Sequence, residues 1–121
     1  VEDFGCFDEN SCDYPDFGFP AARAVAEGKF DRGIFFCGSG NGMNIVANKV
    51  KGVRSAIAYN PDVARLAAQD TACKIICFGA RFMELDKIKN CIEAFLSADM
   101  AIEERHRRRV KKIEEGEDVC G

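Results

Sequence analysis

The sequence predicts an α/β protein, a three-layer α/β/α sandwich with a Rossmann-like parallel sheet. Two observations predict this fold class. Short, continuously apolar segments at 33–37 and 74–78 are bounded by glycine or polar residues, which is typical of strands buried on both faces. They alternate with longer segments whose apolar residues recur at helical spacing. Repeated strand–helix units of this kind build a parallel sheet covered by helices on both faces.

The order of elements follows from the same patterns. Asn60 stands before Pro61 at a position that favours a capped helix start, and Gly28 and Gly79 are expected to end a helix and a strand. Residues 13–15 are expected in a polar loop. The expected elements are a strand at 1–4, a helix at 19–27, a strand at 33–37, a helix at 42–50, a strand at 53–59, a helix at 61–70, a strand at 74–78, and helices at 84–98 and 102–113.

Length and composition restrict the class of protein further. The 121 residues suffice for one domain, and 47% apolar with 31% charged residues is typical of a globular chain. A net charge of -3 argues against a protein that coats nucleic acid, and no apolar run approaches the length of a membrane span. Seven cysteines, an odd number spread along the chain, predict the reducing cytoplasm rather than a secreted disulfide scaffold. With a single histidine, no metal site is expected.

The most informative segment is the run from Cys37 to Gly42, Cys-Gly-Ser-Gly-Asn-Gly, between an expected strand and an expected helix. Glycines let the backbone turn tightly and direct several N–H groups into one concavity, and a helix N-terminus adds to its preference for anions. The run matches neither the dinucleotide-binding fingerprint nor a Walker A loop. It predicts an anion site, with a tight turn of no function as the alternative.

Cys37 opens this glycine run, at a place where a thiolate could attack a carbon or abstract a proton. A neighbouring helix N-terminus favours the thiolate form. The alternative is a small apolar side chain that fills space at the end of a strand, which is the commonest role of a free cysteine.

The segment 105–112 is rich in arginine and lysine, which permits three interpretations. Acidic residues flank it on both sides, so a solvated helical face with ion pairs is the ordinary one, and nucleic-acid binding is disfavoured. Arg105 and Arg109, however, lie one helical turn apart beside an apolar stripe that includes His106. Two guanidinium groups on one face match a phosphate group well.

Several short motifs then occur in a recognisable order: Asp-Tyr-Pro at 13–15, the glycine run at 37–42, Asn-Lys at 48–49, Gly-Val-Arg at 52–54, Phe-Gly-Ala-Arg at 78–81 and Arg-His-x-x-Arg-Val at 105–110. Over residues 1–113 the chain resembles the type B ribose-5-phosphate isomerase family, which includes galactose-6-phosphate and allose-6-phosphate isomerases. The resemblance implies a cofactor-free enzyme that acts on a sugar phosphate. It also implies active sites completed across a homodimer interface, in a dimer or a dimer of dimers.

The resemblance also implies a role for individual residues. Cys37 would be the base that moves a proton between sugar carbons, and Ser39 would assist with its hydroxyl. Arg81, Arg105 and Arg109 would bind the substrate, chiefly through its phosphate. Tyr14 would line the site, and the backbone from Gly38 through Gly40 and Asn41 to Gly42 would hold the enediolate oxygens.

The chain departs from the family pattern in two places. It begins about one strand and one helix later than family members, so it is expected to be an N-terminally incomplete domain that lacks a strand beside the one ending at Cys37. In addition, Asp70 and Thr71 stand where the family has its ring-opening histidine and an asparagine neighbour. An ordinary aspartate is ionised at neutral pH and cannot donate the proton that opens a furanose ring.

These observations give a hypothesis with alternatives. The chain is expected to interconvert ribose 5-phosphate and ribulose 5-phosphate through an enediolate, with Cys37 and Ser39 in the chemistry and Asp70 and Thr71 at the ring-opening position. The alternatives are isomerisation of a hexose 6-phosphate, or a non-catalytic sugar-phosphate-binding paralogue or subunit. A cysteine hydrolase is disfavoured because its histidine base would have to come from far along the chain. No membrane or nucleic-acid partner is expected.

Overall fold

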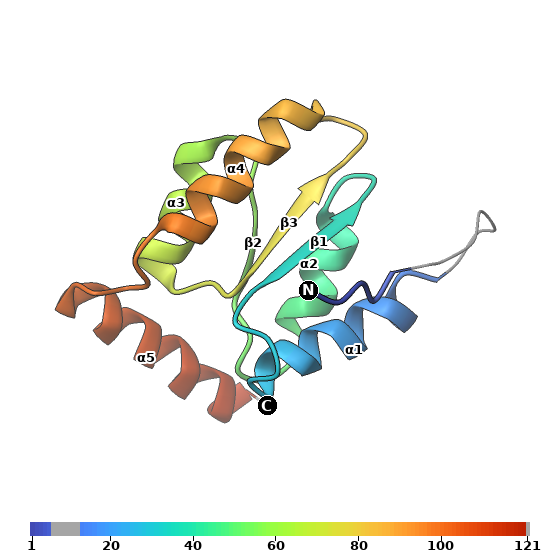
Figure 1. The fold of residues 1–121 in the computed structure, drawn as a ribbon. Coiled ribbons are helices and arrows are strands. Elements are labelled where there is room, and N and C mark those ends of the chain that lie inside the picture. The colour runs from blue at the N-terminus through green and yellow to red at the C-terminus, as the bar shows by residue number, and fades with distance from the viewer. Residues whose placement is uncertain (6–12, 121) are drawn as a thin grey trace.

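The computed structural model describes the backbone of residues 1–5 and 13–120 (Figure 1). Helices and strands alternate along most of the chain, as the sequence predicts. The elements are α1 (Pro15–Ala26), β1 (Gly33–Cys37), α2 (Asn41–Asn48), β2 (Ser55–Ile57), α3 (Pro61–Thr71), β3 (Ile75–Gly79), α4 (Leu85–Ser97) and α5 (Glu104–Cys120).

The three strands form a parallel sheet in the order β1-β3-β2, so the last strand in the sequence lies in the centre. Its register pairs Gly33 with Ile75 at one end of the β1–β3 ladder and Cys37 with Gly79 at the other. The carboxyl ends of β1 and β3 are therefore neighbours. The loops that follow these two strands meet at one edge of the sheet, which is where ligand sites of open parallel sheets lie.

Helices cover both faces of the sheet, which confirms the three-layer sandwich (Figure 1). All five residues of β3 are buried, and its side chains alternate between the two faces. Ile75 and Cys77 pack with residues of α1 and α2, whereas Ile76 and Phe78 pack with residues of α3 and α4. None of the helices in the described part of the chain is long and apolar enough to cross a membrane.

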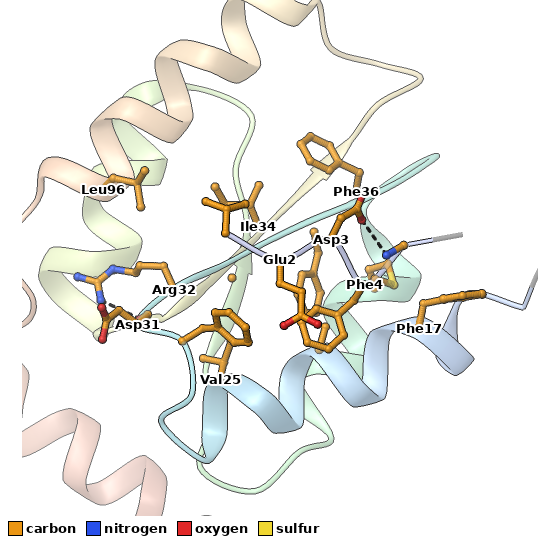
Figure 2. A pocket seen from close by; sticks show the side chains of 17 residues that line it. Glu2, Asp3, Phe4, Phe17, Val25, Asp31, Arg32, Ile34, Phe36 and Leu96 are labelled. Carbon is orange, nitrogen blue, oxygen red and sulfur yellow. Dashed lines mark hydrogen bonds between the residues drawn. The ribbon is translucent and has the colours of Figure 1, made fainter. Parts of the chain in front are cut away.

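The other edge of β1 has no strand partner among the described residues. Gly33 donates its N–H to the carbonyl of Lys74, the residue before β3, at 2.8 Å, so by alternation the backbone polar groups of Ile34 and Phe36 point away from β3. A pocket of about 500 Å³ lies there, between this edge and residues 1–5 (Figure 2). This is the edge at which the resemblance places an additional strand.

Two expectations at the N-terminal end are wrong. Residues 1–4 form no strand, because β1 pairs with none of them; Phe4 instead packs edge-on against Phe30, with ring centroids 5.8 Å apart. The first helix starts at Pro15 rather than at residue 19. Proline suits the first helical turn, and Pro20 inside the helix removes only one backbone hydrogen bond.

Two further differences concern the burial of β1 and the length of α5. The strand β1 is not buried on both faces, since Phe36 is 50% exposed. The helix α5 runs to Cys120 rather than ending at residue 113, and two contacts hold its later turns: Glu114 pairs with Arg54 at 2.9 Å, and Glu117 accepts a hydrogen bond from the N–H of Gly52 at 3.0 Å. The predicted cap of α3 is confirmed, since the Asn60 side chain accepts a hydrogen bond from the N–H of Val63 at 2.8 Å.

Candidate active site

The loop between β1 and α2 turns the chain back over the carboxyl end of the sheet. Gly40 has a φ of 86°, in the left-handed region that favours glycine, and it is the N-cap of α2. Its N–H donates a hydrogen bond to the sulfur of Cys37 at 3.1 Å. The turn thus places the thiol of Cys37 against the N–H of Gly40 at the start of a helix.

Three further predicted residues lie at the same turn. The hydroxyl of Ser39 accepts a hydrogen bond from the N–H of Asn41 at 3.2 Å, which shapes the start of α2. Tyr14, the N-cap of α1, lies over Gly42; a Cβ on this glycine would be 2.5 Å from the Tyr14 ring. The Tyr14 side chain is 47% exposed, so its ring lines the mouth of the turn rather than the core.

The loop after β3 is joined to this turn by two backbone hydrogen bonds. Ala80 donates to the carbonyl of Cys37 at 2.8 Å, and Arg81 donates to the carbonyl of Gly38 at 3.1 Å. The side chain of Arg81 lies along Gly38, where a Cβ would be only 3.0 Å from its Nε. We call the assembly of Cys37, Ser39, residues 38–42, Tyr14 and Arg81 the loop cluster.

Cys37 differs from the other described free cysteines in its surroundings. It is partly exposed, whereas Cys73, Cys77 and Cys91 are buried. Burial raises the pKa of the Cys77 thiol to about 12, and burial also raises the pKa of Cys73 and that of Cys91. These three groups stay protonated at neutral pH. Among the cysteines with described side chains, Cys37 is therefore the one placed for thiolate chemistry.

The other predicted site residues gather elsewhere, where the end of α3 meets the start of α5. His106, only 8% exposed, places its Nε2 3.3 Å from Oδ1 of Asp70 and 3.8 Å from Oε2 of Glu103. The hydroxyl of Thr71 donates to the carbonyl of Ala67, one turn back in its own helix, at 2.7 Å.

The two predicted phosphate-binding arginines are exposed on the first turns of α5. Arg105 pairs with Glu103 at 3.0 Å, and Arg109 follows one helical turn later on the same side. We call Asp70, Thr71, His106, Arg105 and Arg109 the helix cluster.

The structure does not bring the two clusters together within one chain. The helix α3 returns from the carboxyl end of β2 toward the start of β3, so Asp70 and Thr71 lie at the amino edge of the sheet. Cys37 and Gly79 end their strands at the opposite edge. Five residues of β3 separate the two edges, roughly 15 Å at strand geometry. Figure 1 shows α5 beside the lower end of α3, away from the arrowhead of β1.

Arg54 connects the parts of the helix cluster and was not identified from the sequence as a site residue. Its Nε donates to the carbonyl of Thr71 at 3.0 Å and its NH2 group to the carbonyl of Ala72 at 3.1 Å, which satisfies the end of α3. Its NH1 group pairs with Glu114 of α5 at 2.9 Å. The carbonyl partners could not be foreseen, because they follow from the packing of α3 against β2.

Gly79 is a second residue that sequence reasoning treated only as the end of a strand. A Cβ at this position would lie 2.5 Å from the backbone oxygen of Ser39, far inside van der Waals contact. Only a residue without a side chain lets β3 approach the glycine turn this closely. The absent side chain of Gly79 therefore determines where the loop cluster lies against the sheet.

We expect Gly79→Ala to lower both stability and activity. The clash is with backbone, so no side-chain rotation relieves it, and such overpacking costs about 1–3 kcal/mol of the free energy of unfolding. Initial rates and urea unfolding measure the two effects. Gly116→Ala is the matched control, because a Cβ there meets nothing within 4 Å. A wild-type kcat in the Gly79→Ala protein would show that the glycine turn does not depend on the close approach of β3 to Ser39.

Nowhere in the described part of the chain do three or more His, Cys, Asp or Glu side chains converge in a way that could hold a metal ion. The loop cluster instead combines a thiol, backbone N–H groups and a guanidinium. This set can move a proton at carbon, stabilise an oxyanion and bind an anionic group.

Comparison with known proteins identifies the family of the chain. Residues 1–113 match the model of the Ribose/Galactose Isomerase family. The chain is 36% identical to ribose-5-phosphate isomerase B of Escherichia coli over 93% of its own length and 75% of that protein. It is 41% identical to D-erythrulose-4-phosphate isomerase of Pectobacterium atrosepticum over 71% of its length and 57% of that protein.

A solved structure shares the fold closely. Ribose-5-phosphate isomerase B of Clostridium thermocellum superposes with a TM-score of 0.96 at 40% identity, over 100% of this chain and 81% of that one. The family model covers nearly the whole chain, and the curated relatives and solved structures agree with it. The chain therefore belongs to the ribose/galactose isomerase family of sugar-phosphate isomerases.

Proposed function

We propose that this chain interconverts an aldose phosphate and its ketose, with ribose 5-phosphate and ribulose 5-phosphate as the pair, and that Cys37 moves the proton. The observation that carries the proposal is the position of the Cys37 sulfur, partly exposed and bonded by the N–H of Gly40 at the mouth of the glycine turn. A thiolate held there takes the proton from the carbon next to the carbonyl. The electron pair of that C–H bond forms the enediolate, the same thiol returns the proton to the adjacent carbon, and the hydroxyl proton moves from one of the two sugar oxygens to the other.

Each remaining residue of the loop cluster has a part in this reaction. The amino end of α2 presents backbone N–H groups toward the turn, where they stabilise the oxyanion that develops in the enediolate. Ser39 adds its hydroxyl at the same place. Tyr14 and Arg81 line the mouth of the turn and hold the sugar against Cys37.

The phosphate requires a second copy of the chain under this proposal. Arg105 and Arg109 lie on α5 with Asp70 and Thr71, away from the Cys37 of their own chain. In a symmetric dimer, the helix cluster of one subunit can complete the loop cluster of the other, because each surface serves both sites. A homodimer or a dimer of dimers satisfies this requirement.

The direct test is an isomerase assay with the purified protein, using ribose 5-phosphate, ribulose 5-phosphate, galactose 6-phosphate, allose 6-phosphate and D-erythrulose 4-phosphate. We expect turnover of the five-carbon pair without added metal or nucleotide. Turnover of a hexose 6-phosphate alone would show that the proposed substrate is wrong, and would leave the proposed proton transfer by Cys37 unchanged. Binding of sugar phosphates without any turnover would instead identify a non-catalytic subunit.

A further inference from the structure

The side chain of Asn48, at the end of α2, makes directed contacts with β2. Its Oδ1 accepts a hydrogen bond from the N–H of Ser55 at 2.9 Å, and its Nδ2 donates to the carbonyl of Ser55 at 3.0 Å. The same Nδ2 donates to the carbonyl of Asn44, one turn back in α2, at 3.1 Å. The side-chain amide therefore binds both backbone groups of one residue in a strand.

These contacts lie at the free edge of β2, whose strand partner among the described residues is β3 alone. Ala58, just after β2, donates its N–H to the carbonyl of Cys77 in β3. By alternation, the backbone polar groups of Ser55 point away from β3. Asn48 supplies there the donor and the acceptor that a further strand would supply. The last turn of α2 is thereby held in register with β2.

The apolar face of α2 does not fix the position of the helix along its axis. Met43, Val46 and Ala47 are buried, and α1 packs closely on this face, since a Cβ on Gly18 would lie 3.0 Å from Met43 and from Val46. Apolar contacts are non-directional, whereas a hydrogen bond requires a narrow range of distance and angle. Among the described residues, no side chain of α2 other than Asn48 is hydrogen-bonded to a strand.

The opposite end of α2 carries the turn that holds Cys37. Gly40 is the N-cap of the helix, and its N–H donates to the sulfur of Cys37 at 3.1 Å. A Cβ on Gly40 would lie 3.2 Å from the backbone nitrogen of Gly79, so the start of the helix rests against the end of β3. The helix is roughly 12 Å long. A shift of its last turn along β2 would therefore move the N–H of Gly40 relative to the sulfur.

We propose that Asn48 is a positioning residue for the proton transfer at Cys37. Its amide, paired with the backbone of Ser55, holds α2 in the register that keeps the N–H of Gly40 against the Cys37 sulfur. Asn48 acts from the far end of the helix and not by contact with the reacting atoms. The inference rests on the proposed function, since it concerns how the geometry of the same site is maintained.

Asn48→Ala tests the proposal by separating kcat from KM. Alanine has a higher helix propensity than asparagine, so the change removes the contacts with Ser55 without weakening α2 itself. We expect kcat to fall about tenfold, the effect of one net hydrogen bond. KM should change less than about twofold, because the proposed phosphate-binding arginines lie on α5. A wild-type kcat in the Asn48→Ala protein would overturn the proposal.

Two control variants separate positioning from a general effect on the fold. Lys49→Ala changes the exposed neighbour of Asn48 and leaves the contacts with Ser55 in place, so its kcat should be that of the wild type. Ile88→Val removes a methylene group from the core on the other face of the sheet and also lowers stability. Well below the melting temperature it should keep its kcat. A loss of kcat in either control equal to that in Asn48→Ala would contradict the proposal.

Amide hydrogen exchange supplies a measurement that does not depend on turnover. The N–H of Gly40 should exchange about tenfold faster in the Asn48→Ala protein, because its hydrogen bond to Cys37 opens more often. The amides of β3 should exchange as in the wild type. Unchanged exchange at Gly40 would overturn the proposal even if kcat fell. Absence of isomerase activity in the wild type would instead overturn the proposed function, whatever the exchange at Gly40, so the two failures are distinguishable.

Discussion

Replacement of Cys37 with alanine is expected to lower turnover by about 10²- to 10⁴-fold, the range for loss of a positioned base. Binding of the sugar phosphate should change only a few-fold, because the backbone N–H groups and the arginines are unaffected. The effect should therefore appear in kcat, with KM nearly unchanged. Cys91→Ala is the control, since Cys91 is fully buried in the core between α3 and α4.

Chemical modification gives the same prediction in the unmutated protein. Iodoacetamide should inactivate the enzyme, and substrate should protect it. Burial raises the pKa values of Cys73, Cys77 and Cys91, so these thiols should react slowly. Peptide mapping must identify the alkylated residue, because Cys6 and Cys12 lie outside the described residues and nothing is described of the side chain of Cys120. Near-normal turnover of Cys37→Ala, or inactivation traced to another cysteine, would exclude Cys37 as the base.

Arg109→Ala is expected to raise KM for the phosphorylated substrate about ten- to a hundredfold, since a hydrogen bond to a charged group contributes about 1.5–3 kcal/mol. The kcat should fall much less, because Arg109 binds a group remote from the reacting carbons. Arg108→Ala is the matched control: it removes the same charge from the neighbouring position, where Arg108 pairs with Glu104 at 2.9 Å. Equal effects of both variants would indicate a loss of general attraction rather than a phosphate contact.

The same variant tests the shared site. If α5 of one subunit serves the loop cluster of the other, a mixed dimer of Cys37→Ala and Arg109→Ala chains contains one fully intact site. At substrate concentrations well below the raised KM, where each variant alone has little activity, random mixing of the two proteins should then recover about a quarter of the wild-type activity. If the arginine acts within its own chain, every site carries one defect and nothing is recovered.

Steep, salt-dependent binding of duplex DNA would instead support the nucleic-acid interpretation of the basic segment at 105–112.

The repeated strand–helix pattern predicted the architecture well, because burial on both faces gives a strand a continuous apolar signature. β3 shows that signature and is fully buried, as expected. The pattern misplaced the ends of elements where local chemistry decides them. The apolar pattern suggested a helix start at residue 19 although the helix begins at Pro15, and residues 1–4, expected as a strand, pair with no strand.

The turn at residues 37–42 of the loop cluster could be predicted because its residues are consecutive in sequence, and because a glycine-rich turn after a strand has a characteristic composition. The sequence by itself thus determined the fold class, the thiol at the turn and the family. Only the tertiary structure decided that Asp70 pairs with His106, 36 positions away, and that Gly79 allows β3 to approach Ser39. It also decided that the helix cluster lies at the opposite edge of the sheet from Cys37. These relations depend on how elements distant in sequence pack together, and no local pattern of residues records such contacts.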